Sequence, residues 1–85
     1  MKPTSIRLFI KPWCGWCHDV IDWLDARGIQ YEKLDVTADR AAMQEMKAFS
    51  GQTSAPTIEV DGEVLADFGA DELADWWREQ GFEPK

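Results

Sequence analysis

Two cysteines separated by two residues, Cys14 and Cys17, stand between a short apolar run and an amphipathic stretch. The run Ile6–Ile10 predicts a buried strand, residues 11–13 a turn, and the residues from Cys17 onward a helix. Cys14 is therefore expected at a helix N-terminus, where the first-turn N–H groups and the helix dipole stabilise a thiolate. We expect Cys14 to be a redox nucleophile.

The length of 85 residues predicts one small domain, residues 1–85. Two cysteines are too few for the disulfide framework of a small secreted protein, and the chain opens without a charged and apolar leader. We therefore expect a cytoplasmic protein, in which a CxxC pair is more often catalytic or metal-binding than structural. Apolar stretches fall short of the roughly 20 residues that cross a bilayer.

Nine basic and sixteen acidic residues give a net charge of −7. This charge repels phosphate backbones and anionic lipid surfaces, so we expect neither nucleic acid nor a membrane as a partner. Solubility explains the charge more simply than electrostatic steering of a partner does.

The spacing of apolar residues beyond the cysteines predicts a first helix and a second strand. One apolar stripe with helical spacing contains Cys17, Val20, Ile21 and Leu24. Cys17 is thus expected to face inward. Gly28 is expected to end this helix, and residues 29–36 alternate like a strand. Because a helix separates them, the first two strands should be parallel.

The middle of the chain predicts a second helix and a hairpin. Thr37 is a plausible N-cap for a helix that ends at Ser50-Gly51. Asp61-Gly62 is a strong two-residue turn signal between the apolar runs 57–60 and 63–65. These two runs are expected to pair as antiparallel strands.

A third helix is expected near the C-terminus. The acidic residues 71–72 suit a helix N-terminus, and Leu73, Trp76 and Trp77 form its apolar face. We expect the two tryptophans to be packing residues and the tail 81–85 to be frayed.

Four segments of the chain resemble the glutaredoxin family: residues 11–17 (Lys-Pro-Trp-Cys-Gly-Trp-Cys), 53–56 (Thr-Ser-Ala-Pro), 61–62 (Asp-Gly) and 68–71 (Phe-Gly-Ala-Asp). The resemblance covers nearly the whole chain. It implies a thioredoxin-like α/β fold with a four-stranded mixed sheet and three helices, in the order β-α-β-α-β-β-α. It also implies a thiol–disulfide oxidoreductase with glutathione as co-substrate and no permanent cofactor.

The resemblance assigns several residues to the glutathione site. Ala55–Pro56 is expected to be a cis peptide facing Cys14, with Ser54 in the same loop and the backbone of Ala55 pairing with the cysteinyl part of glutathione. Lys11 matches a lysine that meets a glutathione carboxylate. Trp16 stands where the family has an aromatic side chain beside the sulfur path.

The γ-glutamyl end of glutathione falls, by the same resemblance, on the Ala70 N–H and the Asp71 carboxylate. The sequence departs from the family at Gly15, where proline is frequent. Ala55-Pro56 and Phe68 resemble instead the glutaredoxin-like redoxins that serve ribonucleotide reductase and take electrons from thioredoxin reductase. The sequence therefore leaves open whether glutathione or thioredoxin reductase supplies the electrons.

The expected mechanism divides the work between the two thiols. The Cys14 thiolate attacks a disulfide or a glutathionylated cysteine, and Cys17 or free glutathione resolves the mixed disulfide. The expected partners are glutathione and disulfide-containing or glutathionylated proteins, and the chain is expected to be a monomer. A permanent Cys14–Cys17 bridge is disfavoured, since closing so short a loop removes little chain entropy.

Other readings of the cysteine motif stay open. The family resemblance also implies that a [2Fe–2S] cluster could bridge two chains through Cys14 and glutathione, because some glutaredoxins with a small residue after the first cysteine, here Gly15, bind one. Haem attachment through the CxxCH pattern ending at His18, with Met43 or Met46 as axial ligand, is the weaker reading. A zinc site is weaker still, because Cys14, Cys17 and His18 have no obvious fourth ligand beside them. An interaction module without redox chemistry is the remaining alternative.

Overall fold

The computed structural model describes residues 1–84 and contains one mixed sheet with the strand order β2-β1-β3-β4. The central strand β1 (Ile6–Ile10) runs parallel to β2 (Glu32–Asp35) and antiparallel to β3 (Thr57–Val60). β3 pairs in turn with the edge strand β4 (Glu63–Ala66). The parallel first pair and the antiparallel hairpin confirm the expected thioredoxin-like topology.

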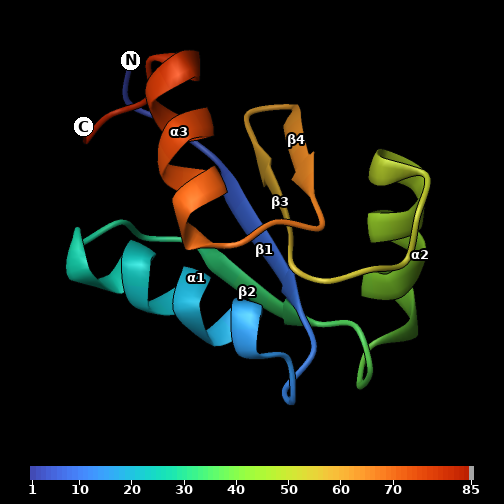
Figure 1. Ribbon diagram of the computed structural model, residues 1–85. Coiled ribbons are helices and arrows are strands. Elements are labelled where there is room, and N and C mark those ends of the chain that lie inside the picture. Colours follow the sequence, from blue (N-terminus) through green and yellow to red (C-terminus); the bar gives the residue numbers. More distant parts are fainter. Residues whose placement is uncertain (85) are drawn as a thin grey trace.

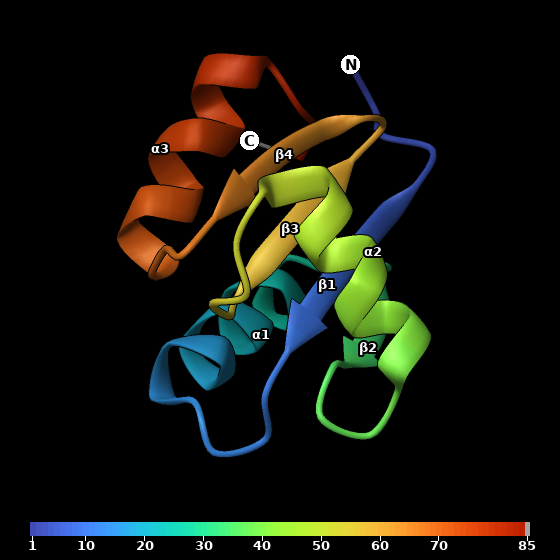
Figure 2. The ribbon, with the colours of Figure 1, turned by 90° about the vertical axis from the view of Figure 1, so that its right-hand side faces the viewer.

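Helices cover both faces of this sheet. α1 (Gly15–Ala26) and α3 (Ala70–Gln80) lie on one face, and α2 (Arg40–Ser50) lies on the other, as the two views in Figures 1 and 2 show. The side chains of β1 contribute to the cores on both faces of the sheet, because successive residues of a strand point to opposite faces. Leu8 therefore belongs to the larger core under α1 and α3, whereas Phe9 belongs to the smaller core under α2.

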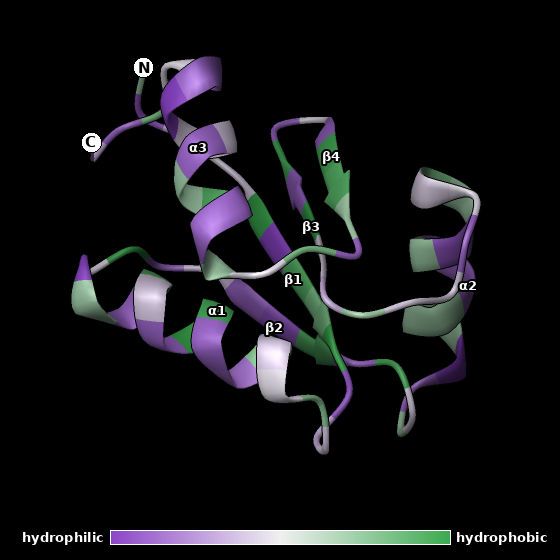
Figure 3. Cartoon of the chain, in the orientation of Figure 1, coloured by the Kyte–Doolittle hydropathy of each residue, from purple (hydrophilic) through white to green (hydrophobic). Residues whose placement is uncertain are grey.

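The apolar residues follow this layering. Figure 3 shows β1 and β3 mostly green at the centre, while the helices carry purple along their outer sides. The larger core contains Leu8, Ile10, Cys17, Val20, Leu24, Ile29, Ile58, Val60, Phe68, Leu73, Trp77 and Phe82. The smaller core contains Phe9, Val36, Ala42 and Met46.

The ends of α1 and the hairpin turn follow the local signals in the sequence. Gly28 adopts φ +66° directly after α1, and the N–H groups of Gly28 and Ile29 bond back to the carbonyls of Asp25 and Leu24. This left-handed closure is the conformation that glycine allows most readily. At the hairpin, Asp61 and Gly62 both have positive φ, as a two-residue turn between twisted strands requires.

The second helix begins later than the sequence predicts. Asp39, not Thr37, is the N-cap of α2, and its carboxylate accepts the Ala42 N–H at 3.2 Å. Thr37 is instead held by the carboxylate of Asp35, which accepts from its N–H and its hydroxyl. Thr37 and Asp39 are equally acceptable N-caps in sequence. Thr37 is bound by Asp35 at the end of β2, so Asp39 caps the helix.

The expectation of a frayed C-terminal tail is wrong for residues 81–84, and Lys85 lies outside the described residues. The Phe82 side chain is only 2% exposed and packs edge-on against Trp77 at 5.1 Å between ring centroids. The indole N–H of Trp77 donates to the Pro84 carbonyl at 2.9 Å, and the Glu83 N–H donates to the Met1 carbonyl. The tail is thus held in place, with Phe82 in the larger core. None of the helices within residues 1–84 combines the length and apolarity that crossing a membrane requires.

Candidate redox site at the start of α1

Cys14 is the N-cap of α1, as the sequence predicts. Its backbone is extended (φ −89°, ψ 115°), and its Sγ atom accepts a hydrogen bond from the Cys17 N–H at 3.2 Å. The turn before it is closed by a bond from the Cys14 N–H to the Lys11 carbonyl. A sulfur that caps a helix in this way faces first-turn N–H groups and the positive end of the helix dipole, both of which favour an anion. Cys14 is half-buried, so it stays within reach of a substrate.

Cys17 lies one turn further along α1 and belongs to the larger core, with 1% of its surface exposed. Burial raises the pKa of Cys17 to about 12; the hydrogen bond and the charge of Cys14 add to this rise, and Lys11 opposes it. The inward orientation predicted from the apolar stripe is confirmed. Both cysteines are free thiols in this structure.

The loop before β3 lies directly against Cys14. The Ala55–Pro56 peptide is cis, as the family resemblance implies, and the Ala55 carbonyl oxygen is 3.7 Å from Cys14 Sγ. The Pro56 carbonyl accepts the Asp67 N–H at 2.9 Å, which ties this loop to the segment that leads into α3. Cys14 and Ala55, 41 positions apart in the chain, are thereby brought into contact.

Gln52 holds this loop in place, although no pattern in the sequence marks it. Its amide nitrogen donates to Ser50 Oγ at 2.9 Å, to Thr57 Oγ1 at 3.1 Å and to the Ser54 carbonyl at 3.2 Å. Its amide oxygen accepts the Ser54 N–H. Thr57, which is fully buried, donates its own hydroxyl to the Ser54 carbonyl at 3.0 Å. No periodic pattern marks such a residue, because its partners meet only after the loop has closed.

A hollow of about 300 Å³ lies between the first turns of α1 and α3. It is lined by Trp16, Asp19, Gly69, Ala70, Asp71 and Glu72. Three of the residues assigned to glutathione by resemblance, Trp16, Ala70 and Asp71, therefore share one hollow, whereas Lys11 is not among its lining residues. Trp16 is 53% exposed, so its indole ring is open to a substrate at this hollow.

Two further side chains flank the turn that carries Cys14. Trp13 is 75% exposed, which leaves its indole ring open to solvent beside the site. His18 Nε2 lies 2.8 Å from the Pro12 carbonyl oxygen, so His18 braces the turn that precedes Cys14. Within residues 1–84, His, Cys, Asp and Glu form no group of three or more that could hold a metal ion.

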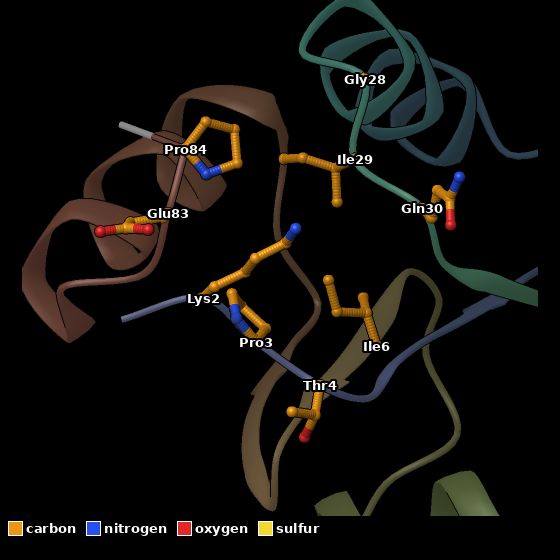
Figure 4. A pocket seen from close by; sticks show the side chains of 9 residues that line it. All are labelled: Lys2, Pro3, Thr4, Ile6, Gly28, Ile29, Gln30, Glu83 and Pro84. Carbon is orange, nitrogen blue, oxygen red and sulfur yellow. The ribbon is translucent and has the colours of Figure 1, made fainter.

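A second hollow, of about 350 Å³, lies at the opposite end of the sheet (Figure 4). It is bounded by Lys2 and Ile6 from the N-terminal segment, by Gly28 and Ile29 after α1, and by Pro84 from the tail. Because Ile6 begins β1 and Gly28 follows the end of α1, this hollow is remote from the cysteines, which lie near the other ends of both elements.

The comparisons with known proteins agree with one another. The family model named Glutaredoxin matches residues 6–65. A glutaredoxin-like 8.6 kDa protein from the rubredoxin operon of Clostridium pasteurianum is 28% identical over 68 residues, which span 80% of this chain and 91% of the relative. Glutaredoxin 3 of Escherichia coli strain K12 is 27% identical over 70 residues, 82% of each chain.

Solved structures share the fold. The crystal structure of the thioredoxin-like protein BC3987 superimposes with a TM-score of 0.77 at 32% identity, over 84% of this chain and 97% of that protein. Two more distant structures show the fold alone. These are the Escherichia coli NrdH-redoxin (TM-score 0.72, 19% identity, 85% and 93% coverage) and a buckwheat glutaredoxin–glutathione complex (TM-score 0.70, 22% identity, 89% and 70% coverage).

Proposed function

This chain belongs to the glutaredoxin family, and from that premise we propose that it is a thiol–disulfide oxidoreductase with Cys14 as nucleophile and Cys17 as resolving thiol. One observation carries the assignment of roles. Cys14 Sγ caps α1, accepts the Cys17 N–H and faces the Ala55 carbonyl, while Cys17 is buried one turn away. The more accessible sulfur, that of Cys14, is thus the one that meets a substrate, and the buried sulfur of Cys17 reacts with it afterwards.

The proposed reaction consists of two thiol–disulfide exchanges. The Cys14 thiolate attacks one sulfur of a substrate disulfide, an S–S bond forms between them, and the other substrate sulfur leaves with the bonding electrons and takes up a proton. Cys17 then gives up its proton and attacks Cys14 Sγ, which releases the remaining substrate sulfur as a thiolate. The substrate gains two electrons, and the protein is left with a Cys14–Cys17 disulfide.

Glutathione is the proposed source of electrons. Two molecules of glutathione reduce the Cys14–Cys17 disulfide in turn and leave as glutathione disulfide. The Ser54–Pro56 loop offers the backbone of Ala55 beside Cys14, so it suits pairing with an extended tripeptide. Because both thiols must be returned to the reduced state after each cycle, the proposed setting is the reducing cytoplasm.

The two ends of glutathione would meet different residues. The Ala70 N–H is one of the first-turn donors of α3 without a helical partner, so it suits the α-carboxylate of the γ-glutamyl end. The Asp71 carboxylate suits the ammonium group of the same end, with Trp16 beside it in the hollow. Lys11, in the turn before Cys14, suits the carboxylate at the other end.

Two serine variants test the division of labour between the thiols. We expect Cys14→Ser to abolish reduction of both protein disulfides and glutathione mixed disulfides. Cys17→Ser should retain turnover of glutathione mixed disulfides, because glutathione can resolve the intermediate, but should lose direct reduction of protein disulfides. Both rates are measured in a coupled assay with glutathione reductase. Full activity of the Cys14→Ser variant would refute the assignment.

A second electron donor is favoured by the charge of the hollow. Among residues 1–84, its lining contains three carboxylates and no basic side chain, which is a poor environment for the carboxylates of glutathione. A flavoprotein thioredoxin reductase would deliver electrons to the same Cys14–Cys17 disulfide without using this hollow. Reducing the oxidised protein with glutathione and with thioredoxin reductase in parallel, and comparing the two rates, decides between the donors.

A further inference from the structure

The hollow between the first turns of α1 and α3 carries more negative charge than the proposed glutathione contacts need. Asp19 contributes from α1, and Asp71 and Glu72 contribute from the first turn of α3. Binding the γ-glutamyl end engages one ammonium group, for which one carboxylate suffices. Two carboxylates are therefore left unexplained by glutathione alone.

The partners of these carboxylates differ. Glu72 is engaged within the protein, because its Oε1 accepts the Gly69 N–H at 3.1 Å and so caps α3. For Asp19 and Asp71, the part of the chain that the structure describes supplies neither a hydrogen-bond donor nor a salt bridge. Neither Lys11 nor His18 lines the hollow, and the His18 ring is held by its Nε2 at the Pro12 carbonyl. Both carboxylates thus line the hollow without a cationic side chain of the described residues beside them.

An aromatic ring completes the hollow. Trp16 lines it and leaves 53% of its surface exposed, and the face of an indole attracts a cation within about 6 Å of its centroid. The volume of about 300 Å³ is at the small end of the roughly 300–1,000 Å³ range of ligand pockets, so it suits one long side chain. An indole with unpaired carboxylates beside it matches the aliphatic stem and the charged head of lysine or arginine.

We propose that this hollow receives a lysine or arginine side chain of a substrate polypeptide, close to the cysteine that Cys14 attacks, and that Asp19 sets this preference. The inference rests on the proposed function, because it places the basic residue relative to a disulfide held at Cys14. Such a residue competes with the ammonium end of glutathione for the same hollow. The enzyme therefore prefers disulfides in basic sequence surroundings.

Three disulfide-linked peptides of one sequence test the preference. They differ only in the residues that flank the cysteine, which are lysine, serine or glutamate. Each exposed charge pair changes an affinity by about 1.4- to 5-fold, so we expect kcat/KM for the lysine peptide to exceed that for the glutamate peptide at least about fivefold at low salt. At about 0.5 M salt the charges are screened, and the difference should fall to within about twofold.

Asp19→Lys, compared with a matched control, locates the determinant. Asp19 is exposed on α1, and Glu63→Lys makes the same charge change at the hairpin end of the sheet, remote from Cys14. We expect Asp19→Lys to lower the lysine-to-glutamate ratio of kcat/KM about fivefold or more, and Glu63→Lys to leave it within about twofold. Circular dichroism confirms that both variants are folded.

The outcomes separate this inference from the proposed function. Reduction of all three peptides at equal rates, or an equal effect of the two lysine variants, overturns the basic-residue preference and leaves the oxidoreductase role intact. Failure of the wild-type protein to reduce any peptide, with glutathione or with thioredoxin reductase, overturns both.

Discussion

Replacing Gln52 by alanine removes the side chain that fastens the Ser54–Pro56 loop to the start of β3. In the wild-type protein its amide group bonds Ser50, Thr57 and both backbone groups of Ser54. After the substitution, Thr57 still donates to the Ser54 carbonyl, so one link between the loop and β3 survives. The loop that carries the Ala55 carbonyl toward Cys14 is then held by fewer bonds, but it is not released.

The size of the effect follows from these bonds. Each net hydrogen bond contributes about 0.5–1.5 kcal/mol, and water partly replaces the bonds to Ser54, which is exposed. We therefore expect the free energy of unfolding to fall by about 1–2 kcal/mol, which lowers the Tm of a domain of this size by roughly 5–15 °C. A reacting group displaced by about 1 Å can lose about a hundredfold in rate, so a loosened loop should lower kcat/KM about tenfold.

Gln44→Ala is the matched control, because Gln44 is exposed on α2 and has no side-chain hydrogen bond among the described residues. Thermal unfolding gives the stability of both variants, and kcat/KM is measured well below either Tm, where both are folded. A loss of stability alone would assign Gln52 a structural role only. If Gln52→Ala loses no more stability or activity than Gln44→Ala, the reasoning about the loop is refuted.

Three further predictions concern Cys17, Tyr31 and Trp77. Since the pKa of Cys17 is raised to about 12, iodoacetamide at pH 7 should modify Cys14 alone in the folded protein, as peptide mass spectrometry would show. Modification of Cys17 below pH 8 would contradict the assignment. Burial also raises the pKa of Tyr31 to about 12, so both groups hold their protons more tightly in the folded than in the unfolded chain. Denaturant titrations should therefore show full stability below about pH 9 and a decline between about pH 9 and 12, and a flat profile would refute this. Trp77→Phe removes the donor to the Pro84 carbonyl and part of the core volume, so it should lower the free energy of unfolding, measured in urea, by about 1–3 kcal/mol. An unchanged urea midpoint would show that the tail adds nothing to the stability.

The elements that the sequence predicts well are those set by short-range signals. Asp61-Gly62 requires positive φ at two successive residues, and few other pairs tolerate this, so the hairpin and its register follow directly. The capping position of Cys14 and the burial of Cys17 likewise follow from an apolar spacing within one helix. The cis Ala55–Pro56 bond is different, because local energetics favour trans and only the family resemblance predicts cis.

The features that the sequence does not predict depend on contacts between distant segments. Asp39 and Thr37 are both acceptable helix caps, and the end of β2 selects the first. Phe82 follows a glycine near the end of the chain, which suggests a loose tail, yet two tryptophans of α3 hold its ring. The hollow between α1 and α3 similarly unites Asp19 and Asp71, which no sequence spacing relates.

The proposed order of the two exchange steps has a physical basis in this structure. Burial is the main reason why the pKa of Cys17 is high, and the hydrogen bond and negative charge of Cys14 raise it further. Once Cys14 enters a mixed disulfide, its charge is gone, and the effect of Lys11, which lowers the pKa of Cys17, remains. Formation of the intermediate therefore favours ionisation of the thiol that resolves it. In the proposed mechanism the buried thiol stays protonated and unreactive until Cys14 has reacted, because a single turn of α1 separates the half-buried Cys14 from Cys17 in the core.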